Sequence, residues 1–214
     1  LYPSTTTLEL IEKIVSSKIV QNYFDMPIQH ISESMLKRMK RGVGREEHIK
    51  LLRAMRETPN SFVRTTVIVG HPQESEEEFN ELCEFIKEFR FDAINVFAYS
   101  SEEGTSAYEM EGHIPSKVIN SRIAKLNKII TSQQKERKKE MMGKRFEVIV
   151  EGKSEVSEYF YSARCLLWAP QIDGEILVNE IDIDGIETLE AGYYLLEVSE
   201  VKDGYVFGKV IEKL

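Results

Sequence analysis

The feature that most constrains this chain is a change in the spacing of its apolar residues at Gly143. Before this glycine, stretches with the apolar spacing of helices alternate with short β-branched stretches. After it, apolar residues recur at every second position, as in Phe146-Val148-Val150, and no helical spacing remains. Alternating elements followed by an all-strand run indicate separate domains, so we expect one at residues 1–142 and another at 143–214.

The first domain is predicted to be of the α/β class. We expect strands at residues 19–25, 62–69 and 93–99, and the main helices at 46–57, from Ser75 to Phe89, and at 116–142. Thr6 with Glu9 and Ser75 with Glu78 have the spacing of capping boxes, which start helices. Strands separated by helices pair in parallel, so a parallel sheet is expected.

The second domain is predicted to be a small all-β barrel. Five short strands are expected at residues 146–150, 159–167, 175–178, 194–201 and 205–211. Glycines and an Asp-Gly pair separate them, which is the spacing of a five-stranded barrel of the OB kind.

Charge is distributed unevenly between the two domains. Residues 145–214 carry six basic and fifteen acidic side chains, whereas the rest of the chain is nearly neutral. Affinity for nucleic acids depends largely on Lys and Arg, so the second domain is a poor candidate for binding phosphates.

Cysteine content and hydropathy narrow the class further. Cys83 and Cys165 are the only cysteines, too few for a disulfide framework or a cysteine-only cluster site, and both are predicted to be buried apolar residues. No apolar run reaches the ~20 residues that cross a bilayer. These features predict a cytoplasmic protein.

The candidate site lies where the three predicted strands end. Polar, turn-forming segments follow them at residues 25–30, 70–74 and 99–105. Ligands of parallel α/β folds bind at the carboxyl ends of strands, so we expect these segments to meet at one edge. Each also has a purely structural interpretation: His30 as a loop residue with its hydrogen bonds satisfied, and Gly70-x-Pro72 as a tight turn. Arg64 is a charged residue within an apolar strand, which is costly unless it is paired. The sequence leaves it equally open whether Arg64 has a structural role or binds an anionic group of a ligand.

These segments resemble the radical SAM methylthiotransferase family. The resemblance rests on Tyr23-Phe24-Asp25-Met26-Pro27-Ile28-Gln29-His30, on Arg64 to Gly70, and on Tyr99 to Ala107, in the family's order. The predicted barrel is similar to a TRAM domain. Its segment Ala169-Pro170-Gln171-Ile172-Asp173-Gly174 is similar to one found in the branch that modifies ribosomal protein S12.

Two features favour this branch over relatives that modify tRNA. The pair Glu102-Glu103 stands where those relatives typically carry Arg-Pro. An acidic TRAM barrel also suits a basic ribosomal protein, because complementary charge steers encounter, and no direct tRNA binding is expected. A tRNA methylthiotransferase of the same family, and a non-enzymatic β-barrel binding module, remain the alternatives.

The resemblance implies a reaction and its cofactors. Enzymes of this branch insert sulfur and a methyl group at the β-carbon of an aspartate in S12, using S-adenosylmethionine and two [4Fe–4S] clusters. The Cys-x3-Cys-x2-Cys triad that binds the radical cluster is missing here. We therefore interpret the chain as the C-terminal portion of a radical SAM core followed by a TRAM domain, and expect it to be inactive alone.

The resemblance also implies residue roles. The residues placed at S-adenosylmethionine are Gln29, His30, Arg64, Thr66, Val69, Gly70, Pro72 and Tyr99. Glu102 and Glu103 are placed at the basic substrate, and no catalytic or metal-binding residue is assigned. The chain departs from the family at His71, Gln73 and Ser75, where Phe, Gly and Thr are usual.

Overall fold

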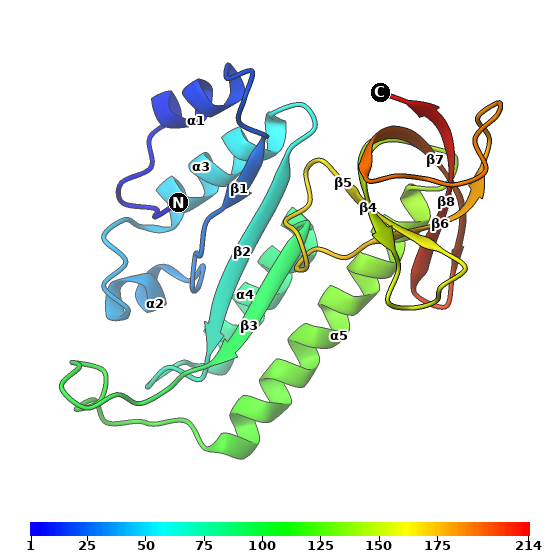
Figure 1. Cartoon of the computed structure of the whole chain (residues 1–214). Coiled ribbons are helices and arrows are strands. Elements are labelled where there is room, and N and C mark those ends of the chain that lie inside the picture. The colour runs from blue at the N-terminus through cyan, green and yellow to red at the C-terminus, as the bar shows by residue number, and fades with distance from the viewer. The chain divides into compact units, whose positions relative to one another are not determined.

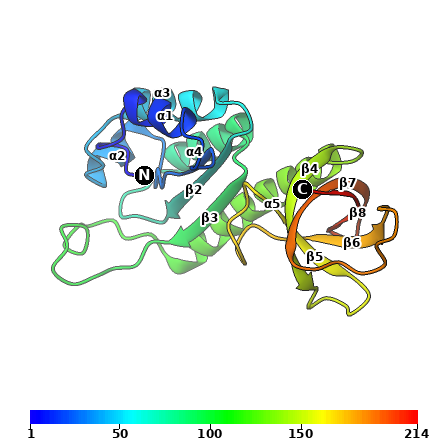
Figure 2. The same ribbon diagram turned by 45° about the horizontal axis from the view of Figure 1, so that its top comes forward.

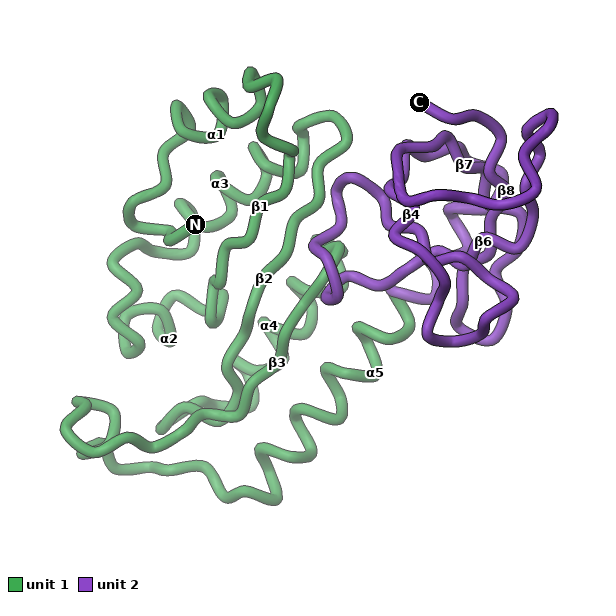
Figure 3. The backbone as a smooth tube through the Cα atoms, viewed as in Figure 1, with its two compact units in different colours: residues 1–133 green, residues 134–214 purple.

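A computed structural model describes all residues, 1–214, and the chain forms two compact units. The first unit covers residues 1–133 and the second residues 134–214 (Figure 3). None of the helices has the length and apolarity needed to cross a membrane.

The first unit alternates helices with three parallel strands (Figure 1). Its elements are α1 (Leu8–Val15), β1 (Tyr23–Asp25), α2 (Glu33–Arg38), α3 (Arg45–Glu57), β2 (Phe62–Val69), α4 (Glu76–Phe89), β3 (Ala93–Ala98) and α5 (Ser116–Glu140). Helix α5 begins in the first unit and ends in the second. The sheet has the order β1-β2-β3, and both strand pairs are parallel, as predicted.

Local signals start two of these helices. The capping box of Ser75 and Glu78 is present in full at the start of α4, as predicted. The box predicted at Thr6 is wrong by one residue. Thr7 caps α1 by accepting a hydrogen bond from the Leu10 amide, and the Thr6 hydroxyl instead donates to the Tyr2 carbonyl.

The core of the first unit lies on one face of the sheet. Alternate residues of β2 point to opposite faces, and Val63, Val67 and Val69 pack among the apolar residues of α1, α3, α4 and α5. The helices lie on the same side of the sheet in both views (Figures 1 and 2). The opposite face carries Arg64 and Thr66. Thr65 is on the core side and is fully buried, and its hydroxyl donates to the Met26 carbonyl at 2.8 Å.

The second unit is a closed five-stranded barrel, as predicted. Its strands are β4 (Arg145–Lys153), β5 (Tyr161–Cys165), β6 (Ile176–Ile181), β7 (Gly192–Lys202) and β8 (Tyr205–Lys213), in the order β4-β5-β6-β8-β7 with β7 returning to β4. Inward-facing residues such as Val148, Leu196 and Val210 are fully buried and form its core. Closure leaves no strand edge unpaired.

Candidate functional site

Main-chain hydrogen bonds join the three predicted segments at the carboxyl end of the sheet. After β1, the Gln29 amide donates to the Thr66 carbonyl at 2.9 Å, and the Ile68 amide donates to the Gln29 carbonyl at 2.8 Å. After β3, the Tyr99 amide donates to the Val69 carbonyl at 2.8 Å. The polar loops therefore share one edge, which is where parallel sheets bind ligands.

Gln29 and Tyr99 each bring a buried polar atom without a partner to this edge. Gln29 adopts a left-handed backbone conformation with φ of 66°, which is costly for a residue other than glycine. Its Oε1 atom and the Tyr99 hydroxyl are buried, and neither makes a hydrogen bond. Buried polar atoms are nearly always paired, so a ligand that supplies partners would relieve this cost. These two residues fit a polar cofactor.

A buried ionic network fixes the turn after β2. The carboxylate of Glu74 lies 3.4 Å from His30 Nε2 and 2.6 Å from Arg122 Nη1, and it accepts the Gly70 amide at 2.8 Å. The Ser32 amide donates to His30 Nδ1, so the neutral ring carries its proton on Nε2, facing Glu74. The side chains of His30 and Glu74 are fully buried. The network therefore links the first loop, the second loop and α5.

Gly70 is required by both conformation and space. Its φ is +88°, and a Cβ there would lie 2.5 Å from the Cδ1 atom of Ile119 on α5. Only a residue without a side chain brings the backbone this close. Beside it, the His71 ring meets the Tyr99 ring edge to face at 5.2 Å, and burial lowers the pKa of His71.

Arg64 and Thr66 lie on the sheet face opposite the helices, on β2 before the loop that follows its carboxyl end. Arg64 donates from Nη1 to the Tyr23 hydroxyl at 3.2 Å and from Nη2 to Asn95 Oδ1 at 3.4 Å. Its guanidinium thus spans all three strands. The side chain of Val69 instead packs in the helical core, so only its backbone is at the edge.

Glu102 and Glu103 lie away from these contacts. Both are exposed on the segment between β3 and α5, which Figure 1 shows as an extended loop. Ser100 donates to Glu102 Oε1 at 2.7 Å. The far end of this loop is tied to the second loop, because the Gln73 amide donates to the Gly112 carbonyl at 2.8 Å.

No residue set in this chain fits an iron–sulfur cluster. Both cysteines are buried and unpaired, and they lie in α4 and β5, which belong to different units. Burial raises the pKa of both thiols, that of Cys165 to about 12, whereas cluster ligands are thiolates. No group of three or more His, Cys, Asp or Glu residues is arranged to hold a metal ion.

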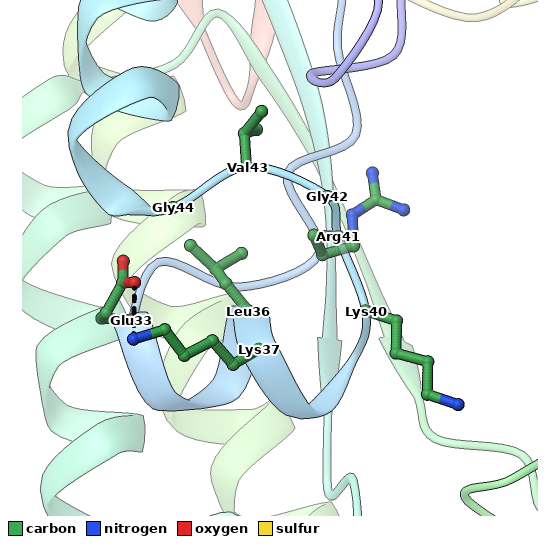
Figure 4. Close-up of a pocket in the computed structure, with 8 residues that line it drawn as sticks. All are labelled: Glu33, Leu36, Lys37, Lys40, Arg41, Gly42, Val43 and Gly44. Carbon is green, nitrogen blue, oxygen red and sulfur yellow. Dashed lines mark ion pairs between the residues drawn. The ribbon is translucent and has the colours of Figure 1, made fainter.

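A cavity of about 280 Å³ lies between α2 and the start of α3 (Figure 4). Its lining residues are Glu33, Leu36, Lys37, Lys40, Arg41, Gly42, Val43 and Gly44. The Glu33 carboxylate accepts the Arg45 amide at 2.7 Å and pairs with Lys37 at 3.2 Å, and the amide hydrogen bond lowers the pKa of Glu33. Glu33 thus occupies the helix N-terminus where an anionic ligand would bind. None of the predicted cofactor-binding residues lines this cavity.

Arg122 is the site residue that the sequence reasoning missed. It lies on α5 three residues after Ile119 and four before Leu126, which is within the buried stripe of that helix. A charged residue in an apolar stripe needs a buried partner, and Glu74 provides it. The charged residue within this apolar stripe was the sequence signal that could have identified Arg122 as part of the site.

The fold and site define a class: a radical SAM type of α/β unit followed by a TRAM domain. Residues 2–86 match the radical SAM superfamily, and residues 142–211 match the TRAM domain. The name of the matched superfamily implies S-adenosylmethionine chemistry in its members. The solved structure of coproporphyrinogen III oxidase (HemN) from Escherichia coli, a radical SAM enzyme, has a TM-score of 0.52 over 62% of this chain and 31% of that chain. At 19% identity, this likeness concerns the fold alone.

The particular proteins that this chain is similar to are ribosomal protein uS12 methylthiotransferases named RimO. It is 61% identical to the Wolinella succinogenes protein over 84% of this chain and 41% of that protein. It is 50% identical to the Helicobacter hepaticus protein over 100% of this chain and 49% of that protein. It is 52% identical to a Helicobacter pylori protein over 99% of this chain and 47% of that protein. The predicted resemblance is confirmed. The chain spans about half the length of these curated relatives, consistent with their C-terminal portion.

Proposed function

We propose that this chain is the C-terminal portion of a radical SAM methylthiotransferase that modifies the β-carbon of an aspartate in ribosomal protein S12. The observation that carries the proposal is the identity of 50% or more to RimO proteins across essentially the whole chain. The acidic pair Glu102-Glu103 and the acidic barrel support a basic protein as substrate rather than tRNA. A ribosomal substrate also supports a cytoplasmic location.

The chain's own residues are proposed to bind and orient S-adenosylmethionine. Gln29 Oε1 and the Tyr99 hydroxyl are buried atoms that need hydrogen-bond partners, and Arg64 carries paired donors that suit a carboxylate. Gly70 lets the backbone approach closely, and Pro72 stiffens the same turn. Thr66, His30 and the backbone of Val69 complete the proposed set. When bound, S-adenosylmethionine supplies the radical and sulfur-transfer chemistry together with two [4Fe–4S] clusters, whose ligands lie outside this chain.

The substrate is tested by deleting the gene that encodes the full-length protein. We expect mass spectrometry to show that S12 loses its methylthio group, while the methylthiolated nucleosides of tRNA are unchanged. Loss of the tRNA modification with S12 intact would assign the protein to the tRNA branch. No change in either would favour a non-enzymatic binding module.

The cofactor role is tested separately with Arg64→Ala in the full-length protein. We expect affinity for S-adenosylmethionine to fall about tenfold or more, because charge-assisted hydrogen bonds to a carboxylate are lost. Calorimetric titration measures it. Arg53→Ala, an exposed arginine on α3, is the matched control and should bind normally. Unchanged affinity in Arg64→Ala would remove this residue from the site.

A further inference from the structure

Helix α5 differs from the other helices in the charge of its exposed side. From Ser116 to Lys135 the helix contains no acidic residue. Four exposed lysines, which we call the lysine line, follow one side of it: Lys117, Lys128, Lys135 and Lys139. Surfaces of soluble domains usually mix charges of both signs, so a line of one sign points to a binding role.

The spacing of the lysine line places its members on one side of the helix. Figure 1 shows α5 as one continuous helix, and successive lysines of the line are about three, two and one turns apart. At a rise of about 1.5 Å per residue, the line is about 33 Å long. The residues between them on this side, Ser121, Ala124 and Thr131, are uncharged. Leu126 and Ile130 are on the opposite side and are buried.

The lysine line lacks the ion pairs that exposed lysines make on other helices of this chain. On α1, α3 and α4, each of Lys13, Lys50 and Lys87 lies within 3.4 Å of a glutamate three or four residues earlier. The four members of the lysine line make no ion pair or hydrogen bond, and the acidic residues of α5, Glu136 and Glu140, are at its end. Direct pairing within the chain therefore does not neutralise the lysine line.

The chemistry of the lysine line fits the phosphates of a nucleic acid. Lysines that contact phosphates release counterions and bind without regard to sequence. Duplex RNA is recognised mostly through its shape and its backbone, which offers rows of phosphates to a line of cations. A membrane surface fits less well, because an interfacial helix inserts its apolar side, and that of α5 packs in the core. A protein partner fits less well too, since the centre of a protein interface is mainly apolar and aromatic.

We propose that the lysine line binds the phosphate backbone of duplex RNA, and that this RNA is the ribosomal RNA beside S12 in the small ribosomal subunit. The source of the RNA rests on the proposed function, which makes a ribosomal protein the substrate. The RNA is bound but not modified. The inference makes S12 within the subunit, rather than free S12, the preferred substrate.

The first test measures binding of the full-length protein to a fluorescein-labelled RNA duplex of about 20 base pairs. Fluorescence anisotropy gives the dissociation constant at KCl concentrations between about 50 and 200 mM. Lys128→Gln with Lys135→Gln should weaken binding about tenfold and reduce the salt slope by about two, one for each lost phosphate contact. Lys50→Gln with Lys87→Gln makes the same change of charge at exposed lysines that are paired, and should leave both values unchanged.

The second test distinguishes the possible sources of the RNA. Unlabelled small ribosomal subunits and tRNA are each used to displace the labelled duplex, and the subunits should do so at lower concentrations. The full-length enzyme is then assayed on S12 within subunits and on free S12. Lys128→Gln with Lys135→Gln should lose the preference for subunits, whereas the control pair should keep it. Circular dichroism at 222 nm shows whether each variant is folded.

Four results would overturn the inference. These are no binding of the duplex by the wild-type protein, equal losses in the two double variants, displacement by tRNA at lower concentrations than by subunits, and equal wild-type activity on free and subunit-bound S12. The proposed function is decided separately by the mass of S12 in the deletion strain. Binding of the duplex is measured without S12, so either can fail while the other stands.

Discussion

The two units bury the faces and edges of their sheets in different ways. The barrel closes on itself and fills its interior with apolar side chains such as Val148 and Leu196. The parallel sheet keeps two edge strands, covers one face with helices, and buries charged residues beside its carboxyl edge. Gln29 and Tyr99 carry buried atoms without partners there, whereas no residue of the barrel strands does.

This difference indicates where each unit is specialised. The closed barrel has an apolar interior, and its charged residues are on the outer surface. The sheet unit contains buried charges that must be paired and polar atoms that gain partners only from a ligand. We therefore expect the first unit to lose more stability than the barrel when a single charge or a single glycine is replaced.

Breaking the buried network should have the largest effect. Arg122→Met leaves the Glu74 carboxylate without its closest cation, and losing one partner of a buried pair costs about 3–5 kcal/mol. Urea unfolding followed by circular dichroism at 222 nm reports the unfolding of the helices. The emission of Trp168, the single tryptophan, reports the barrel. The helical transition should shift to lower urea, while the Trp168 transition should stay in place.

Two comparisons isolate the charge effect. Lys125→Met, one turn from Arg122 on α5, removes an exposed hydrogen bond to Asn80 and should cost less than about 1 kcal/mol. Adding Glu74→Gln to Arg122→Met should recover stability, because the unpaired charge is then gone. Equal losses for Lys125→Met and Arg122→Met would contradict a buried ionic role.

A backbone comparison between the units comes next in size. Gly70→Ala in the sheet unit and Gly208→Ala in the barrel each place a Cβ 2.5 Å from an apolar side chain, but only Gly70 has a left-handed φ. We expect about 2–4 kcal/mol for Gly70→Ala, from overlap plus backbone strain. For Gly208→Ala we expect about 1–3 kcal/mol, from overlap alone. The free energy of unfolding of each variant is measured with the same two signals, at 222 nm for the helices and from Trp168 for the barrel.

Further variants separate overlap from strain. Gly104→Ala has a φ of +79° with open space around it, so it should cost only about 1 kcal/mol. Ile119→Ala should restore part of the stability lost in Gly70→Ala, because it removes the overlapping atoms. If Gly104→Ala and Gly70→Ala cost the same, the close approach to α5 has no energetic importance.

The same comparison shows what the sequence could predict. The parallel sheet, the five barrel strands and the second and third sheet strands follow from apolar spacing, which is local, and were confirmed. The first strand was predicted at residues 19–25 and is shorter, Tyr23–Asp25. Contacts made across the fold were not predictable in this way. Glu74 and Arg122 are 48 residues apart, and their pairing depends on how α5 packs. For the same reason the sequence placed Val69 at the site but could not show that its side chain faces the helices.

The smallest effect expected is a pH dependence confined to the first unit. All four histidines, His30, His48, His71 and His113, lie in that unit, and the barrel has none. Burial lowers the pKa of His48 and of His71. His48 also uses its Nδ1 proton to donate to the Gly44 carbonyl at 2.9 Å, which leaves its buried Nε2 without a partner. Protonation of either ring therefore opposes folding.

The sign of the pH dependence follows from these shifts. A histidine whose folded pKa is depressed binds fewer protons than in the unfolded chain, whose value is about 6.5. Stability is therefore present above about pH 6.5 and is lost as the pH falls toward the folded pKa. From pH 7.5 to 5.5, the 222 nm transition should lose on the order of 1 kcal/mol, while the Trp168 transition should change little. His48→Gln with His71→Gln should flatten the slope, and His113→Gln, an exposed control, should keep it. A slope that persists in the double variant, or that appears equally in the Trp168 transition, would show that acid sensitivity does not distinguish the two units.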